Sequence, residues 1–152
     1  MEWGKTVDGM KCGVVSNRCR YAPSERIRLK LQLQVEGTRG TRVPEFHLAH
    51  ILLPRKVTRN HLINVVAKDR SGREIPYRGR RYSGGLGHVS DLTLSPGRVI
   101  PRSFEISRWF DFTPDGSPYR ITVRIQPWSY ETDFPHYWMG TLESNEIEIR
   151  IQ

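Results

Sequence analysis

The sequence has little of what builds helices or membrane spans. Only three of its 152 residues are alanine, and 13 glycines and 10 prolines leave few long stretches free of both. No apolar run approaches the roughly 20 residues that a membrane helix needs. The length suits one domain, residues 1–152, and 37% apolar with 26% charged residues indicates neither a disordered nor a membrane chain.

β-Branched residues are abundant instead, with 11 Val, 11 Ile and 9 Thr, and they favour strands. Apolar and polar residues alternate strictly over 27–35, 119–126 and 147–152, which predicts strands with one buried face. We therefore predict an all-β fold, a two-sheet antiparallel sandwich of seven to nine strands. Over 59–69 a helix is the alternative to a strand. Further strands are expected at about 10–16, 46–53, 61–68, 73–77, 88–94 and 99–107.

Several short phrases together resemble one family. They are Trp3-Gly4 with Val7 and Gly9-Met10, then 21–27, 69–76, 94–97, and Gly116 with Tyr119, Ile121 and Val123. This pattern is similar to bacterial immunoglobulin-like modules, although Ser24 stands where those modules usually have glycine. The resemblance implies an immunoglobulin-like sandwich of exported or cell-surface proteins, used as a binding or spacing unit and carrying no active site. It favours an extracellular or periplasmic location, with a cytoplasmic one kept as the alternative.

Two structural expectations concern Tyr119 and the cysteines. Tyr119 follows a Pro-Asp-Gly-Ser-Pro corner, so its ring can enter the core while its hydroxyl bonds a backbone group of that connection, as in a tyrosine corner. If residues 14–17 form a hairpin loop, Cys12 and Cys19 lie opposite one another and a disulfide is possible. Two reduced thiols are the equal alternative.

Positive charge is concentrated in one segment. Residues 55–81 hold nine basic residues against Asp69 and Glu74, and so carry seven of the chain's eight net positive charges. Arginine suits bidentate contacts to carboxylates or phosphates. However, Arg outnumbers Lys by 19 to 5 throughout, which a GC-rich genome also produces.

Aromatic residues crowd into residues 128–138. A hairpin folded over the end of a sheet and a binding surface are both compatible with this loop. Neither a nucleophile elbow nor a phosphate loop nor a cysteine-rich zinc site occurs, and His47 and His50 point to opposite faces of a strand. We therefore predict no enzyme, no catalytic residue, no metal and no cofactor.

The predicted function is that of a non-catalytic binding or assembly module with an acidic protein partner. The alternative is an accessory or inhibitory domain that docks on an enzyme or larger complex, and binding of nucleic acid or another polyanion is the weaker alternative. The predicted partner-binding residues are Arg55, Lys56, Arg59, Arg70, Arg73, Arg78, Arg80, Arg81, Trp128, Tyr130, Phe134, Tyr137 and Trp138.

Overall fold

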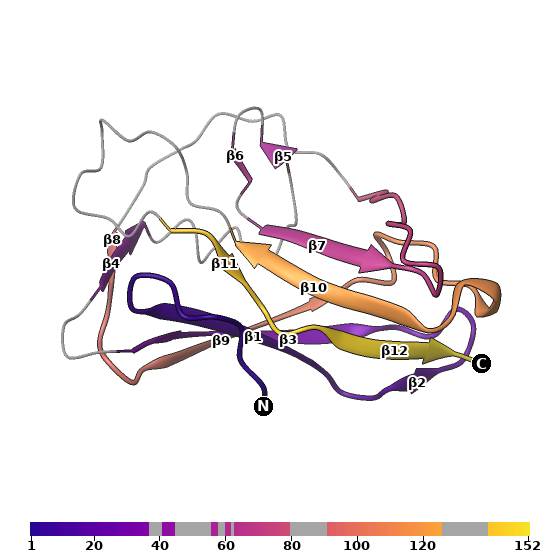
Figure 1. Cartoon of the computed structure of the whole chain (residues 1–152), viewed down its shortest axis with the longest axis horizontal. Coiled ribbons are helices and arrows are strands. Elements are labelled where there is room, and N and C mark those ends of the chain that lie inside the picture. The colour runs from indigo at the N-terminus through magenta and orange to yellow at the C-terminus, as the bar shows by residue number, and fades with distance from the viewer. Residues whose placement is uncertain (37–40, 45–55, 58–59, 62, 80–90, 126–139) are drawn as a thin grey trace.

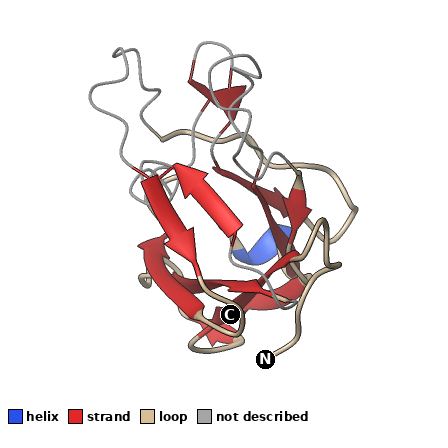
Figure 2. Cartoon of the chain, turned by 90° about the vertical axis from the view of Figure 1, so that its left-hand side faces the viewer, coloured by secondary structure: helices blue, strands red, loops and turns tan. Residues whose placement is uncertain are grey.

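Strands dominate the computed structural model of this chain (Figure 1). The structure describes residues 1–36, 41–44, 56–57, 60–61, 63–79, 91–125 and 140–152. Within these ranges there is no α-helix, and a single turn of 3-10 helix, η2 (Pro114–Gly116), precedes strand β10, as Figure 2 shows in blue. The predicted all-β character is confirmed.

The first sheet has the order β1 (Met10–Ser16), β3 (Arg28–Val35) and β9 (Val99–Glu105), with both pairs antiparallel. The central strand β3 alternates as the sequence predicts, because its leucines and Val35 point into the core while Arg28 and Lys30 face solvent. The register places Leu31 between Val14 and Arg102.

The second sheet is built around β10 (Tyr119–Ile125). One edge of β10 pairs with β7 (Ile63–Lys68), and the other edge pairs with β12 (Ile147–Ile151) and then with β11 (Leu142–Glu143). Strand β2 (Arg20–Tyr21) joins β12 in parallel, so the sheet is mixed and the expectation of purely antiparallel sheets is wrong. A strand of two residues has no periodicity from which this pairing could be predicted.

Two small ladders complete the described strands. Strand β4 (Thr41–Pro44) pairs with β8 (Asp91–Leu94), and β5 (Lys56–Val57) pairs with β6 (Asn60–His61), both antiparallel.

The two larger sheets share one hydrophobic core. Burial of these side chains is the main stabilising contribution to the fold. The largest side chains that are almost completely buried come from both sheets and their connections: Tyr119, Ile27, Leu29, Leu31, Ile106, Ile121, Leu142, Ile149 and Val14.

A kink between β11 and β12 links the sheets through side chains. The N–H of Val14 donates to Asn145 Oδ1 at 2.8 Å, and Asn145 Nδ2 donates to the Val14 carbonyl at 3.0 Å. The N–H of Val123 donates to Ser144 Oγ at 2.9 Å, and the N–H of Ser144 donates to the Val123 carbonyl at 2.9 Å. The asparagine thus takes the place of a strand residue beside β1.

The weaker strand predictions have mixed outcomes. Over the predicted strand at 61–68, β7 excludes the helix alternative from residue 63 onward. Residues 73–77 do not form the predicted strand, since only Glu74 makes a bridge, to Lys68. The strand expected at 46–53 lies outside the described residues, and 88–94 is represented by β8.

The cysteines do not form the hairpin that would bring them together. Residues 10–16 are one continuous strand in which Cys12 pairs with Leu33, so the loop expected at 14–17 is wrong. Both thiols are free, with Cys12 buried and Cys19 exposed. Burial raises the pKa of the Cys12 thiol to about 12, and the carboxylate of Glu143 adds to the rise, so Cys12 is a protonated core residue.

Candidate functional site

The predicted binding residues divide into those that the structure describes and those outside it. Arg70, Arg73 and Arg78 are described with their side chains, and all three are exposed. Lys56 lies in strand β5. Nine further predicted residues lie outside the described residues: Arg55, Arg59, Arg80, Arg81, Trp128, Tyr130, Phe134, Tyr137 and Trp138.

The three described arginines line one cleft, which we call the arginine cleft. It has a volume of about 460 Å³ and lies between the loop at 69–78, which follows β7, and the segment at 111–119. The loop supplies the arginines, and the opposite wall supplies Asp111 and Asp115. Segments that are far apart in the sequence therefore meet at this end of the molecule.

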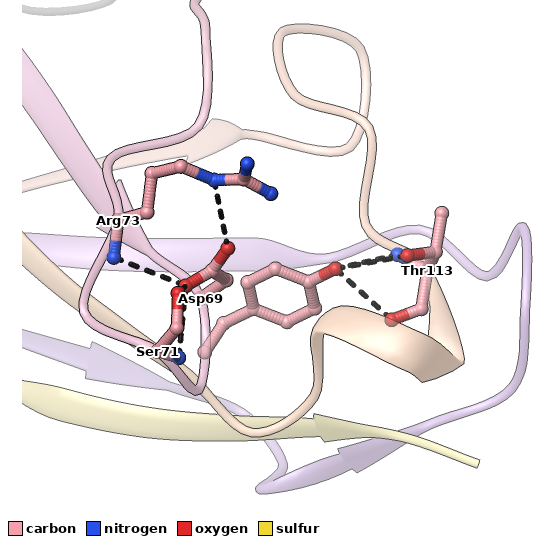
Figure 3. A network of polar contacts seen from close by, with 5 residues as sticks. Asp69, Ser71, Arg73 and Thr113 are labelled. Atoms are coloured by element: carbon pink, nitrogen blue, oxygen red, sulfur yellow. Dashed lines mark hydrogen bonds and ion pairs between the residues drawn. The ribbon is translucent and has the colours of Figure 1, made fainter.

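A tight turn fixes the first part of the loop. The carboxylate of Asp69 accepts from the N–H of Ser71 at 2.9 Å, from the Ser71 hydroxyl at 2.5 Å and from the N–H of Arg73 at 3.0 Å (Figure 3). Arg73 Nε lies 3.3 Å from the second carboxylate oxygen. Gly72 closes the turn with a φ of 83°, a conformation that favours glycine.

The same contacts set the protonation of Asp69. The hydrogen bond from the Ser71 hydroxyl lowers the pKa of this carboxyl, the backbone N–H groups of Arg73 and Ser71 and the charge of Arg73 lower it further, and desolvation opposes them. Asp69 is consequently ionised, and its charge is matched by Arg73. We assign this carboxylate a structural role in shaping the wall of the cleft.

The second part of the loop is tied to the segment before β10. The N–H of Ile75 donates to the Ala67 carbonyl at 2.9 Å, and the N–H of Arg78 donates to the Trp109 carbonyl at 2.7 Å. The centroid of the Tyr77 ring lies 6.2 Å from that of the Trp109 ring and 5.7 Å from that of the Phe110 ring. Aromatic contacts and backbone hydrogen bonds together hold this part of the wall in place.

Tyr119 supports the opposite wall from below. Its side chain is 1% exposed, and its hydroxyl accepts from the Thr113 N–H at 2.8 Å and donates to the Thr113 carbonyl at 3.0 Å. A Cβ added to Gly116 would lie 2.2 Å from that hydroxyl, so glycine lets the ring lie directly under the 3-10 turn. The predicted tyrosine corner is confirmed in its hydrogen bonding, and Figure 3 draws these bonds at Thr113, across the ring from the turn at Asp69.

The arginines differ in how they are paired. Arg73 is paired with Asp69, and Arg78 NH1 forms an ion pair with Asp111 Oδ2, in which the side chains are 65% and 63% exposed. Arg70 donates its backbone N–H to the Gly116 carbonyl at 2.9 Å, and its side chain has no ion pair with any residue the structure describes. With respect to the residues that the structure describes, the cleft thus offers the unpaired guanidinium of Arg70 and the guanidinium of Arg78 in an exposed pair.

Asp111 and Tyr77 are contributors that the sequence does not single out. Asp111 is the partner of Arg78, 33 positions away in the sequence. Pro76, inside the strand expected at 73–77, is the available signal that the chain leaves the sheet there, because proline removes a ladder donor. No sequence pattern signals the pairing of Asp111.

A second cleft, of about 430 Å³, is lined by Asp111 together with Arg26, Arg108 and Phe112 among others. Arg108 is paired with Glu105 at 3.3 Å. Asp111 therefore lines both clefts.

The described part of the chain has neither a metal-binding cluster nor a helix that could span a membrane. It contains no group of three or more His, Cys, Asp or Glu side chains that could hold a metal ion. None of its helices has the length and apolar character needed to cross a membrane.

Comparison with known proteins adds no relative from which a role could be taken. The sequence matches no protein-family model and no curated protein.

Proposed function

We propose that this chain is a non-catalytic, immunoglobulin-like module that binds a protein partner through the arginine cleft. The observation that carries the proposal is the presentation of Arg70, Arg73 and Arg78 on a wall whose backbone is already fixed. A pre-ordered wall loses less conformational entropy on binding than a free loop. The exposed guanidinium groups supply directional, charge-assisted contacts.

The acidic nature of the partner follows from charge. The chain carries a net charge of +8, so an acidic protein is attracted and an equally basic one is repelled. Such attraction is screened over about 8 Å at physiological ionic strength, and binding should weaken as salt is added.

The immunoglobulin-like assignment draws support from two sheets around one core and from the hydroxyl of Tyr119 bonded to Thr113. With it comes the proposed setting of an exported protein, outside the cell or in the periplasm. An accessory or inhibitory domain that docks on an enzyme uses the same wall, and only the identity of the partner separates the two functions.

The test is affinity capture with cross-linking from the source organism, comparing the wild type with an Arg70→Glu/Arg78→Glu variant. The matched control is Arg28→Glu/Lys30→Glu, which makes the same change of charge on exposed positions of β3, in the other sheet. A partner kept by the wild type and the control but lost by the cleft variant supports the proposal. Equal capture by all three, or equal loss from both variants, contradicts a role for the cleft.

A further inference from the structure

The ion pair between Arg78 and Asp111 spans the arginine cleft and is accessible to a ligand. Both side chains are about two-thirds exposed, at 65% and 63%. Exposed pairs of this kind contribute little to stability, because water already solvates both charges. A carboxylate from another molecule can therefore replace Asp111 at little energetic cost, provided that it gains a second contact.

The second contact is available at Arg70. Its backbone is anchored to Gly116, and the backbone of Arg78 is anchored to Trp109. Both anchors lie in the stretch that leads into and forms the opposite wall, so the two arginine positions are fixed relative to one another. Arg70 has no ion-pair partner among the residues that the structure describes, whereas Arg78 already holds a carboxylate.

We propose that the arginine cleft binds an acidic peptide segment, in which one carboxylate displaces Asp111 from Arg78 and a second pairs with Arg70. Asp111 then acts as an internal competitor that occupies Arg78 in the free protein. This inference rests on the proposed function and names the chemistry of the partner at the same site.

A peptide fits this cleft better than a nucleic acid does. The carboxylates of Asp111 and Asp115 line the wall that faces the arginines, and they repel a backbone that carries a negative charge at every phosphate. A peptide can space its carboxylates so that only the arginines are contacted. The carboxylate of Asp111 also shows that a group of this size fits against Arg78.

The experiment measures binding of a fluorescein-labelled Glu-Ser-Glu-Ser-Glu-Ser peptide by fluorescence anisotropy at low salt. Asp111→Asn removes the competitor, and we expect it to tighten binding by about two- to fivefold, the equivalent of up to about 1 kcal/mol. Arg78→Gln and Arg70→Gln remove the contacts, and each should weaken binding by about three- to tenfold.

Matched controls come from another exposed pair of the same kind. Arg124 NH2 lies 2.8 Å from Glu143 Oε2 on β10 and β11, and neither residue lines the arginine cleft. Arg124→Gln and Glu143→Gln change the net charge as the cleft variants do, so they measure the effect of overall charge. Each should change affinity by less than about twofold, since the pair lies outside the site and alters only the long-range attraction. The melting temperature of every variant, taken in the same buffer, identifies any loss of binding that comes from unfolding.

The inference is overturned if Asp111→Asn and Glu143→Gln have equal effects, because net charge then explains the binding. It is also overturned if the peptide shows no saturable binding, or if a single-stranded oligonucleotide binds more tightly and is the ligand whose affinity depends on Arg78. These results leave the proposed function standing wherever the wild type still captures a partner that the Arg70→Glu/Arg78→Glu variant loses. If instead the Arg70→Glu/Arg78→Glu variant captures the partner as well as the wild type does, while peptide binding changes as expected in the single variants, the proposed function is contradicted and the peptide site is not.

Discussion

Replacing Tyr119 with phenylalanine tests how the wall of the cleft is held. The change removes a hydroxyl that accepts from the Thr113 N–H at 2.8 Å and donates to the Thr113 carbonyl at 3.0 Å. Loss of such contacts leaves a backbone donor and acceptor unsatisfied, at about 1–3 kcal/mol. Because Thr113 is exposed and water can reach it, we expect a loss at the lower end, about 1–2 kcal/mol.

Urea unfolding followed by tryptophan fluorescence measures this loss. With an m-value of about 2 kcal/mol/M, the midpoint should fall by about 0.5–1 M. The control is Tyr21→Phe, which removes a hydroxyl bonded to the side chains of Ser16 and Asn17 rather than to the backbone, and should cost less. A shift below about 0.2 M for Tyr119→Phe would refute the view that its hydroxyl holds the 113–116 connection.

A double-mutant cycle with Gly116→Ala adds a test of the packing under the turn. The new Cβ would lie 2.2 Å from the Tyr119 hydroxyl and 2.7 Å from Cζ, and a ring that is 1% exposed has nowhere to move. We expect Gly116→Ala to cost about 1–3 kcal/mol. Since phenylalanine removes the closest of these contacts, the double variant should lose less stability than the two single changes added together.

Three further changes test the core, the kink and the turn. Leu31→Ala removes a side chain that is 0% exposed and should lower the free energy of unfolding, measured in urea, by about 2–5 kcal/mol. A loss below about 0.5 kcal/mol would show that Leu31 does not lie on the buried face of β3. Asn145→Ala leaves the N–H and carbonyl of buried Val14 without side-chain partners and should cost about 2–3 kcal/mol in the same assay. Asn145→Asp should not restore this loss, because a carboxylate oxygen would then face the Val14 carbonyl in place of the Nδ2 donor. Because the pKa of Asp69 is lowered in the folded protein, its carboxylate stabilises the fold fully above the ordinary carboxyl pKa of about 3.9, and this stabilisation is lost as the pH falls through the lower folded pKa. The NMR signal of the Ser71 amide should therefore shift only below about pH 4. Asp69→Asn should abolish that transition.

The strands that the sequence predicts correctly are those with enough residues to show a period. Strand β3 alternates over eight residues, and β10 over seven, so one face of each had to be buried. Strands β2 and β11 have two residues each and are defined only by their neighbours. The predicted strand at 73–77 fails for a related reason, because the turn at Asp69 and the docking of Tyr77 on Trp109 draw the chain out of the sheet.

The sequence predicts the basic side chains of the candidate site better than the acidic side chains that pair with them. The excess of arginine along 55–81 is visible in the sequence, and it suffices to indicate Arg70, Arg73 and Arg78. Their partners follow different rules. Asp69 belongs to a local turn whose spacing can be read from the sequence, whereas Asp111 reaches Arg78 only because Tyr77 packs against Trp109 and Phe110.

The net charge of the chain and the pairing of its individual arginines should affect binding in different ways. The segment 55–81 carries seven net positive charges, yet two of the three arginines that the structure describes in the cleft are already matched by carboxylates. Long-range attraction depends on the net charge of the chain, whereas the contacts at the surface depend on which guanidinium groups remain available. A variant that changes charge far from the cleft should therefore alter the rate of association, and a variant at Arg70 or Arg78 should alter the rate of dissociation. Stopped-flow measurements on the peptide complex separate these two rates, and a change at Arg78 that acts only on association would show that the cleft makes no direct contact.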